Sequence, residues 1–361
     1  MSTNQNLSGM NAADFSKEVD GKQTALFILK NSKGYEVAIT NYGGAVVAIM
    51  VPDKDGKIGN VIQGHDNIDE VISSPEPYLS TLIGRYGNRI CKGKFTLDGK
   101  EYSLAINNGP NALHGGPTGF HRRVWDAKPI GENALELKYV AADMEEGFPG
   151  KFEIEVVYTW TDDCELIIDY KGTTDKKTIV NMTHHGYFSI AGIANPTPTI
   201  DDLICEINAD HYIPIDDTSI PLGSIDPVEG TPFDFRKGMR IGERINEGNG
   251  QLEIGKGYDH NWVLATGGDI DVLAAELYCP ASGICLKVYT NEPGIQVYAG
   301  NFLDGTVTGK KGVCYQRRTA ICLETQHYPD SVNQPSFPSI ILNPGDTYTQ
   351  VCIYKFSTKE N

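Results

Sequence analysis

The segment Phe152-Glu-Ile-Glu-Val-Val-Tyr-Thr-Trp160 alternates apolar and polar side chains, and Glu165-Leu-Ile-Ile-Asp-Tyr170 continues the pattern after a short break. Successive side chains of a strand point to opposite faces, so a two-residue period predicts a half-buried β-strand. Both segments are rich in β-branched and aromatic residues, which strands favour. They predict strands of a sheet with one buried face.

Similar segments recur along the whole chain. Further strands are expected over Tyr35–Thr40, Ala45–Val51, Ile284–Tyr289 and Tyr348–Phe356. Turn-forming residues separate the strands at Asp53–Gly56, Leu97–Lys100 and Asn343–Asp346. Helical periodicity is scarce and predicts only a turn or two near Asn67–Ile72. This pattern is typical of an all-β fold, a large antiparallel β-sandwich. We expect one domain over residues 1–361, with residues 1–20 as a poorly ordered or peripheral segment.

Composition narrows the possible partners. The chain has 361 residues and a formal net charge of −16, which disfavours binding to nucleic acid and to anionic membranes. Its eight cysteines form no CxxC pair, and several lie in apolar runs, as expected for buried free thiols in a reducing compartment. No signal peptide is visible at the N-terminus, so we expect a cytoplasmic protein, although removal of a signal peptide would leave the same sequence.

Polar and ionisable side chains interrupt apolar or Gly-rich sequence in several places. His114 precedes two glycines, where a turn lets the backbone approach a ligand closely, although a surface turn histidine would look the same. His184 and His185 end a strand-like run, so only one of them can face a given cleft. Because of this geometry, and because no metal-ligand spacing is present, a metal site is not expected.

Two carboxylates, Glu324 and Asp259, also allow either a structural or a catalytic interpretation. Glu324 ends the apolar run Ala320–Leu323, where a carboxylate is costly to bury without a partner or a task. An ion pair with an arginine at a strand edge would explain Glu324, and Asp259, equally well. Arg85, Arg89 and Gln296 could simply anchor loops.

Common catalytic motifs are absent from the sequence. It contains no GxSxG, no P-loop and no GxGxxG that opens a helix after a strand. The common hydrolase, kinase and dehydrogenase classes are therefore disfavoured. The remaining histidines and carboxylates suit general acid–base chemistry.

Taken in order, the motifs resemble those of the aldose 1-epimerase (galactose mutarotase) family from about Gly34 to Phe356. The matching segments are Thr40–Gly44, Gly84–Arg89, Leu113–Gly116, Asn181–His185, Gly257–Asn261, Gly300–Gly305, Leu323–Gln326 and Asp330–Pro335. The resemblance implies a galactose mutarotase-like sandwich with an open sugar cleft, and interconversion of the α and β anomers of a free aldohexose such as galactose or glucose. It also implies that no metal or organic cofactor is needed.

The resemblance assigns roles residue by residue. It makes Glu324 the catalytic base, His185 the catalytic acid and His114 a second histidine near the ring oxygen of the sugar. It gives hydroxyl binding to Asn88, Arg89, Asp259 and Gln296. An imidazole with an ordinary pKa of ~6.5 would be a suitable acid near neutral pH.

The sequence departs from the family pattern at two places. The family usually has Asn at the position of His184, and Asn-Leu where this chain has Ser189-Ile190. We expect His184 to lie behind the site or to one side of it. Such changes beside a catalytic group can retune its basicity or the substrate preference.

Two other functions remain open. A hexose-6-phosphate 1-epimerase would need an arginine cluster for phosphate, for which Arg122-Arg123 and Arg317-Arg318 are candidates. A non-catalytic carbohydrate-binding protein on this fold would be expected to lose the acid or the base, and Glu324, His185 and His114 are all present. The chain could act as a monomer or a homodimer.

Overall fold

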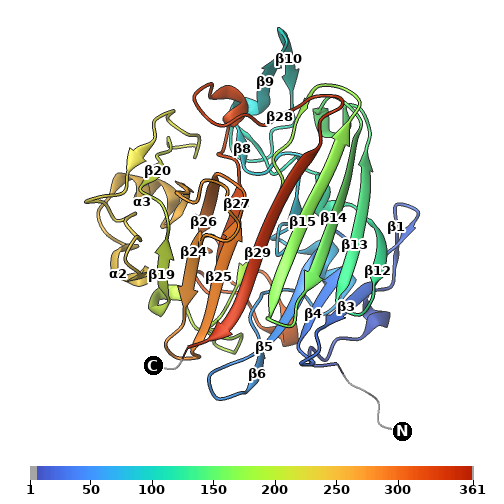
Figure 1. The fold of residues 1–361 in the computed structure, drawn as a ribbon, viewed down its shortest axis with the longest axis vertical. Coiled ribbons are helices and arrows are strands. Elements are labelled where there is room, and N and C mark those ends of the chain that lie inside the picture. Colours follow the sequence, from blue (N-terminus) through green and yellow to red (C-terminus); the bar gives the residue numbers. More distant parts are fainter. Residues whose placement is uncertain (1–5, 360–361) are drawn as a thin grey trace.

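The computed structural model describes residues 6–359 and is built around a nine-stranded antiparallel sheet (Figure 1). In spatial order its strands are β12 (Asp126–Ile130), β13 (Ala134–Ala141), β14 (Phe152–Trp160), β15 (Glu165–Thr174), β29 (Tyr348–Thr358), β25 (Ile284–Thr290), β24 (Ala275–Tyr278), β19 (Ile204–Ile207) and β22 (Met239–Arg240). The strands expected from residues 152–160, 165–170, 284–289 and 348–356 all belong to it. The all-β prediction is confirmed.

Two smaller sheets form the second layer. One has the order β18 (Tyr187–Phe188), β27 (Ile321–Gln326), β26 (Gly294–Tyr298), β23 (Asp259–Val263), β20 (His211–Ile213) and β21 (Asp226–Pro227). The other has the order β3 (Leu26–Lys30), β4 (Glu36–Thr40), β5 (Val46–Pro52) and β6 (Ile58–Asn60). The layers are joined by buried tyrosines as well as by apolar packing. The Tyr354 hydroxyl donates to the Leu323 carbonyl at 2.6 Å, and the Tyr158 hydroxyl donates to the Gly44 carbonyl at 2.8 Å.

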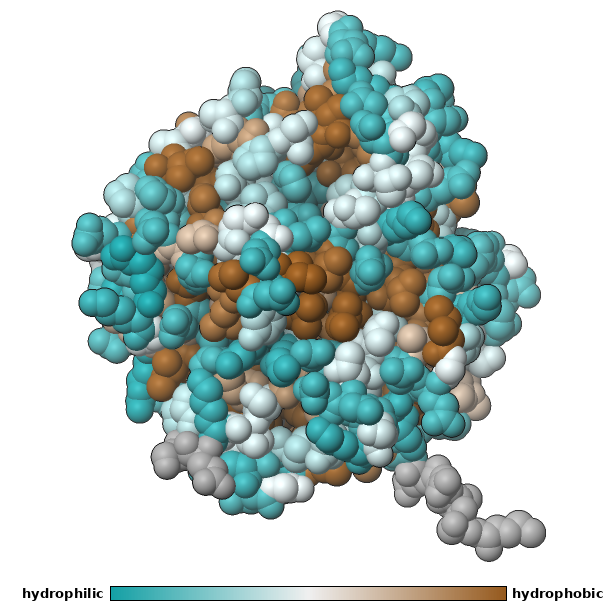
Figure 2. Space-filling model, in the orientation of Figure 1, coloured by the Kyte–Doolittle hydropathy of each residue, from teal (hydrophilic) through white to brown (hydrophobic). Residues whose placement is uncertain are grey.

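Side-chain alternation explains which face of the large sheet is covered. On β14 the fully buried residues are Phe152, Ile154, Val156, Tyr158 and Trp160, and the residues between them are partly or fully exposed. On the outer face an apolar band crosses the middle of the sheet (Figure 2). Across the middle strands half-buried Ile167 pairs with Ile353, which pairs with Tyr289 on the other side.

Strand β29 joins the two halves of the large sheet. It pairs with β15 along one edge and with β25 along the other. One half of the sheet, β12 to β15, is continuous in sequence, whereas the other half comes from residues 204–290. The late strand β29 therefore closes the sheet between them.

Short elements complete the fold. The two-stranded sheets pair β1 (Glu18–Val19) with β2 (Lys22–Gln23), β9 (Lys94–Leu97) with β10 (Lys100–Ser103), β8 (Arg89–Ile90) with β11 (Ala112–Leu113), β16 (Thr178–Ile179) with β28 (Ile341–Leu342) and β7 (Leu82–Ile83) with β17 (Thr183–His184). The α-helices are α1 (Ile68–Ser73), α2 (Ile241–Arg244) and α3 (Gly250–Gly255). The 3-10 helices are η1 (Ala12–Phe15), η2 (Cys91–Gly93), η3 (Phe120–Arg122), η4 (Glu145–Gly147), η5 (Ile200–Asp202), η6 (Lys310–Gly312) and η7 (Ser331–Asn333). Helix α1 covers the predicted helical turn, and the Asn67 side chain caps it by accepting from the Glu70 amide.

The N-terminal segment is more closely tied to the fold than a poorly ordered tail. Phe15 is fully buried in a cluster with Ala38 and Ile68, and the amides of Leu7 and Ser8 donate to the buried Glu36 carboxylate. Residues 1–5 lie outside the described residues. No helix in the described part of the chain is long and apolar enough to cross a membrane. All eight cysteines are free thiols, and all except Cys91 and Cys314 are buried.

Candidate active site

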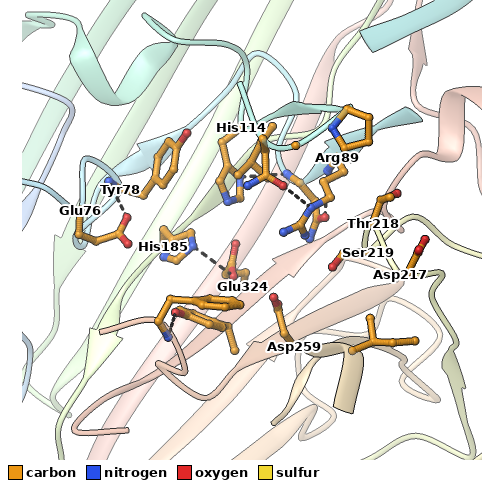
Figure 3. A pocket seen from close by; sticks show the side chains of 18 of the residues that line it. Glu76, Tyr78, Arg89, His114, His185, Asp217, Thr218, Ser219, Asp259 and Glu324 are labelled. Carbon is orange, nitrogen blue, oxygen red and sulfur yellow. Dashed lines mark hydrogen bonds and ion pairs between the residues drawn. The ribbon is translucent and has the colours of Figure 1, made fainter. Parts of the chain in front are cut away.

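A cavity of about 500 Å³ lies over the six-stranded sheet, on the face opposite the sandwich core (Figure 3). It collects most of the residues singled out in the sequence. Its lining includes Asn88, Arg89, His114, His185, Asp259 and Glu324, together with Glu76, Tyr78, Asn108, Leu113, Tyr187, Asp217, Thr218, Ser219, Tyr298 and Phe302.

The two-residue period of the strands explains why these side chains meet. On β27, Ile321 and Leu323 point into the core, so Glu324 lies on the opposite, cavity-facing side. The cross-strand partner of Cys322 is Tyr298, and the partner of Tyr298 is Asp259. Side chains directly opposite each other on neighbouring strands are close, so the sheet itself sets the spacing of this site.

Glu324 and His185 form the central pair. Nε2 of His185 lies 3.5 Å from Oε1 of Glu324, and their side chains are only 6% and 2% exposed. The other carboxylate oxygen of Glu324 has no hydrogen-bond partner among the described residues. Burial raises the pKa of Glu324 well above its ordinary value, with Asp259 adding to the shift, and burial lowers the pKa of His185 to about 4. The free site therefore favours an uncharged pair, which corrects the expectation of an imidazole with an ordinary pKa.

Two tyrosine rings hold the His185 ring in place. Tyr187 stacks on it with ring centroids 5.1 Å apart, and Tyr78 lies nearly parallel to it at 6.1 Å. The thiol of Cys322 lies 3.5 Å from Nδ1 of His185. The cavity-facing nitrogen of His185 is consequently Nε2, the one near Glu324.

His184 lies outside the cavity. Its buried ring packs between Tyr158 and Tyr354, at centroid distances of 6.2 and 6.3 Å. Neighbouring histidines thus point to opposite sides, as expected from strand geometry. Burial lowers the pKa of His184 to about 3, so the ring is neutral in the core.

His114 is held in one tautomer. The backbone amide of Asn88 donates to its Nδ1 at 3.0 Å, so the proton of the neutral ring is on Nε2. Burial lowers the pKa of His114 well below its usual value. Its ring meets the His185 ring edge-on at 5.1 Å. His114 is thus arranged as a neutral hydrogen-bond donor to an oxygen atom in the cavity.

The glycines after His114 are required by the packing of the backbone and not by contact with a ligand. His114 and Gly115 both have left-handed φ values, +51° and +81°. A Cβ on Gly115 would lie 2.1 Å from the Gly84 carbonyl oxygen. The loop therefore packs directly on the Gly84–Arg89 segment and fixes His114 beside Asn88.

Of the four residues expected to bind sugar hydroxyls, three line the cavity and one lies behind them. Arg89 and Asp259 line the cavity, and Nε of Arg89 donates to the Asn108 side chain at 3.0 Å. Gln296 lies outside the lining and donates from Nε2 to Oδ1 of Asp259 at 2.9 Å, so it orients Asp259. Asn88 lines the cavity, and its side chain also accepts from the Arg89 amide. Burial raises the pKa of Asp259.

The remaining arginines have structural partners. Arg85 is a buried loop anchor that donates to the carbonyls of Pro149 and Gly150, both at 2.8 Å. The candidate phosphate-binding pairs, Arg122-Arg123 and Arg317-Arg318, lie outside the cavity lining. Arg89 is the only Lys or Arg among the described lining residues, against the carboxylates of Glu76, Asp217, Asp259 and Glu324.

The side chains of His114, His185 and Glu324 could also hold a metal ion. One ligand atom each from His114, His185 and Glu324 lies within 4.8 Å of the others. Because Nδ1 of His114 accepts from the Asn88 amide, its Nε2 is the nitrogen free to act as a ligand. The arrangement suits either a metal ligand set or acid–base work on a substrate.

Several lining residues were missed in the sequence. Tyr187 lies two residues after the Asn181–His185 motif and could have been suspected there. Glu76, between two prolines, gave no periodic signal. Thr218 and Ser219 come from a turn that the Asp216 side chain caps, and this turn lies 33 or more residues away from the other motifs that it joins.

Comparisons with known proteins give a consistent result. A family model described as aldose 1-epimerase matches residues 25–355. Galactose mutarotase from Bos taurus is 42% identical over 321 residues, which is 89% of this chain and 91% of that protein. Aldose 1-epimerase from Escherichia coli K12 is 34% identical over 339 residues, which is 93% and 96% of the two chains. Among solved structures, an aldose epimerase homologue from C. elegans superposes with a TM-score of 0.85 at 30% identity, covering 93% of this chain and all of that one.

Proposed function

The chain belongs to the aldose 1-epimerase family, and from that premise we propose that it interconverts the α and β anomers of free aldohexoses with Glu324 and His185 as the acid–base pair. The observation that carries the proposal is the 3.5 Å contact between these two buried groups in a sugar-sized cavity. His114 adds a neutral donor beside them.

The reaction opens and recloses a hemiacetal ring. Glu324, as a carboxylate, removes the proton from the C1 hydroxyl while His185, as an imidazolium, protonates the ring oxygen, and the C1–O5 bond breaks to give the aldehyde. Rotation about C1–C2 exposes the other face of the aldehyde, and the reverse proton transfers close the ring. Each positioned group typically supplies about 10²–10⁴-fold.

The pair holds one proton throughout this cycle. In the free site burial favours neutral Glu324 and neutral His185, and the productive charge pair forms by moving that proton from Oε1 to Nε2 across their contact. The charge of Arg89 opposes the rise in the Glu324 pKa and so helps this transfer. Ring opening returns both groups to their neutral forms, so no net charge enters the buried site.

The charge of the cavity favours a neutral sugar over a sugar phosphate. Besides Glu324, the acidic side chains of Glu76, Asp217 and Asp259 line the cavity with one arginine, and the two arginine pairs that could hold phosphate lie elsewhere. Arg89 and Asp259 offer complementary donors and acceptors for ring hydroxyls. A purely sugar-binding role would leave the Glu324–His185 contact without a use.

Polarimetry of freshly dissolved α-D-galactose and α-D-glucose tests the proposal. We expect the native protein to accelerate the decay of optical rotation, and glucose 6-phosphate to be a poor substrate. Glu324→Gln keeps the shape and removes the base, so its rate should fall at least about 10²-fold. A folded Glu324→Gln variant with near-native activity would rule out this role.

The metal-free mechanism makes a separate prediction. Because the proton transfers need only side chains, chelation with EDTA should leave the rate unchanged. The measurement is the same polarimetric rate before and after chelation and dialysis. Loss of activity that zinc or another divalent ion restores would instead assign His114, His185 and Glu324 as a metal site.

A further inference from the structure

We propose that Glu76 and Tyr78 form the subsite for the exocyclic group on C5 of the sugar, and that Glu76 restricts substrates to aldoses whose C5 substituent is uncharged. This inference rests on the proposed function. It adds a specificity-determining residue to the acid–base pair and to the Arg89–Asp259 end of the cavity.

The position of Glu76 in the cavity is the first support. Its carboxylate points into the cavity beside His185, on the side away from Glu324 and Asp259 (Figure 3). With C1 at Glu324 and the ring oxygen at His185, the remaining neighbour of the ring oxygen is C5. The substituent on C5 therefore extends toward the Glu76–Tyr78 end.

Hydrogen bonds fix the Glu76 side chain in a position to meet the C5 substituent. Its Oε1 accepts from the Tyr78 amide at 3.2 Å, and its own amide donates to the Ser74 hydroxyl at 3.2 Å. The Tyr187 side chain lies close enough to the carboxyl group to lower its pKa. Glu76 thus lies beside both residues whose rings flank His185, and no arginine or lysine lines this end of the cavity among the described residues.

The charge of Glu76 determines what the subsite accepts. A carboxylate accepts a hydrogen bond from a hydroxymethyl group and repels a carboxylate or phosphate in its place. The ionisable groups near it include Tyr78 on its own loop, Tyr187 on β18, Tyr298 on β26, Cys322 and Glu324 on β27, and His185. Tyr78 in turn lies near Arg122, Arg89 and His121. Burial raises the pKa of Glu76 to about 7, so its charge changes near neutral pH.

The test compares three sugars that differ only at C5. D-Glucose carries a hydroxymethyl group there, D-xylose carries none and D-glucuronate carries a carboxylate. Anomer exchange is measured at equilibrium by NMR magnetisation transfer for the native protein, Glu76→Ala, Glu76→Gln and the matched control Glu101→Gln, an exposed glutamate on β10.

The expected pattern is a selective change in KM. Glu76→Ala should raise KM for glucose about tenfold, with a change of about twofold or less for xylose and in kcat, because one charged hydrogen bond is lost. Glu76→Gln should raise kcat/KM for glucuronate about tenfold. In the native protein KM for glucose should fall as pH rises through about 7, and this dependence should vanish in Glu76→Gln. Glu101→Gln should match the native protein throughout.

Two results would overturn the subsite. One is an equal change in KM for glucose and xylose in Glu76→Ala, and the other is native turnover of glucuronate as efficient as that of glucose. If Glu76→Ala does not fold by circular dichroism, the native sugar panel and Glu76→Gln decide the question. Absence of anomer exchange with every sugar in the native protein would instead contradict the proposed function.

Discussion

At the scale of single residues, the environment of a side chain determines its chemistry more than its type does. The sequence identified Glu324, His185 and His114 as residues suited to acid–base work. It could not show that burial makes the Glu324–His185 pair neutral, or that Asn88 fixes the tautomer of His114. These properties depend on desolvation and on contacts between distant segments, which no local pattern encodes.

The two neighbouring histidines give a residue-scale prediction. His185→Asn removes the group next to Glu324 and should lower the rate at least about 10²-fold. His184 lies in the core outside the cavity, so His184→Asn should change the rate by about tenfold or less, which is about 1.4 kcal/mol. Polarimetry of both variants at equal concentration of folded protein measures this. The opposite ranking would require a different acid.

The pH dependence of the rate follows from the shared proton. The pair is active with one proton, so activity should fall at low pH when His185 gains a second proton, at about pH 4. It should fall at high pH when the proton is lost from Glu324, whose pKa is raised. The two limbs of the pH profile report apparent pKa values of the Glu324–His185 pair and not of either residue alone, because the two groups are coupled. For D-xylose, which has no C5 substituent to meet Glu76, a kcat/KM profile with its acid limb near pH 6.5 would show that His185 titrates as an unperturbed histidine.

At the scale of elements, the alternation of apolar and polar side chains with a two-residue period predicted strands correctly. It placed β14, β15, β25 and β29, each of which has one covered face. Strands β26 and β27 are buried on both faces, so their alternation separates core from cavity rather than core from solvent. This is why Glu324 could be noticed as a buried carboxylate, while the hydrogen bond from Gln296 to Asp259 left no signal in the sequence.

The loop after β11 gives an element-scale prediction. Gly115→Ala would place a Cβ 2.1 Å from the Gly84 carbonyl oxygen, at a φ of +81°. We expect it to lower the free energy of unfolding by about 2 kcal/mol or more and to reduce the rate by displacing His114. Gly99→Ala is the matched control, because Gly99 has a φ of +77° but nothing within 4 Å of its Cβ position. Equal losses in thermal unfolding for the two variants would show that backbone strain alone, not the contact with Gly84, requires glycine at position 115.

At the scale of the whole molecule, the large sheet links distant parts of the chain. Its two halves come from residues 126–174 and 204–290, and both pair with β29. The sequence predicted the strands but not their order, because pairing between strands more than a hundred residues apart leaves no local trace. The single domain, the oligomeric state and the cytoplasmic location remain predictions.

Cooperative unfolding tests the single-domain prediction. Because neither half of the sheet is complete without β29, both halves should unfold together. Scanning calorimetry should give one transition, with equal calorimetric and van't Hoff enthalpies. Ile353→Pro, in the middle of β29, should remove that transition, since proline cannot donate to the ladder of a central strand. Two separate transitions in the native protein would indicate two domains.

The place of β29 in the sheet also affects how the protein is made. A ribosome releases this strand after every other strand of the sheet, so a nascent chain exposes the open edges of β15 and β25 until β29 emerges. Open edges template pairing with other chains. The nascent polypeptide is therefore most vulnerable to aggregation in the seconds before β29 emerges, which makes chaperone supply during synthesis a determinant of yield.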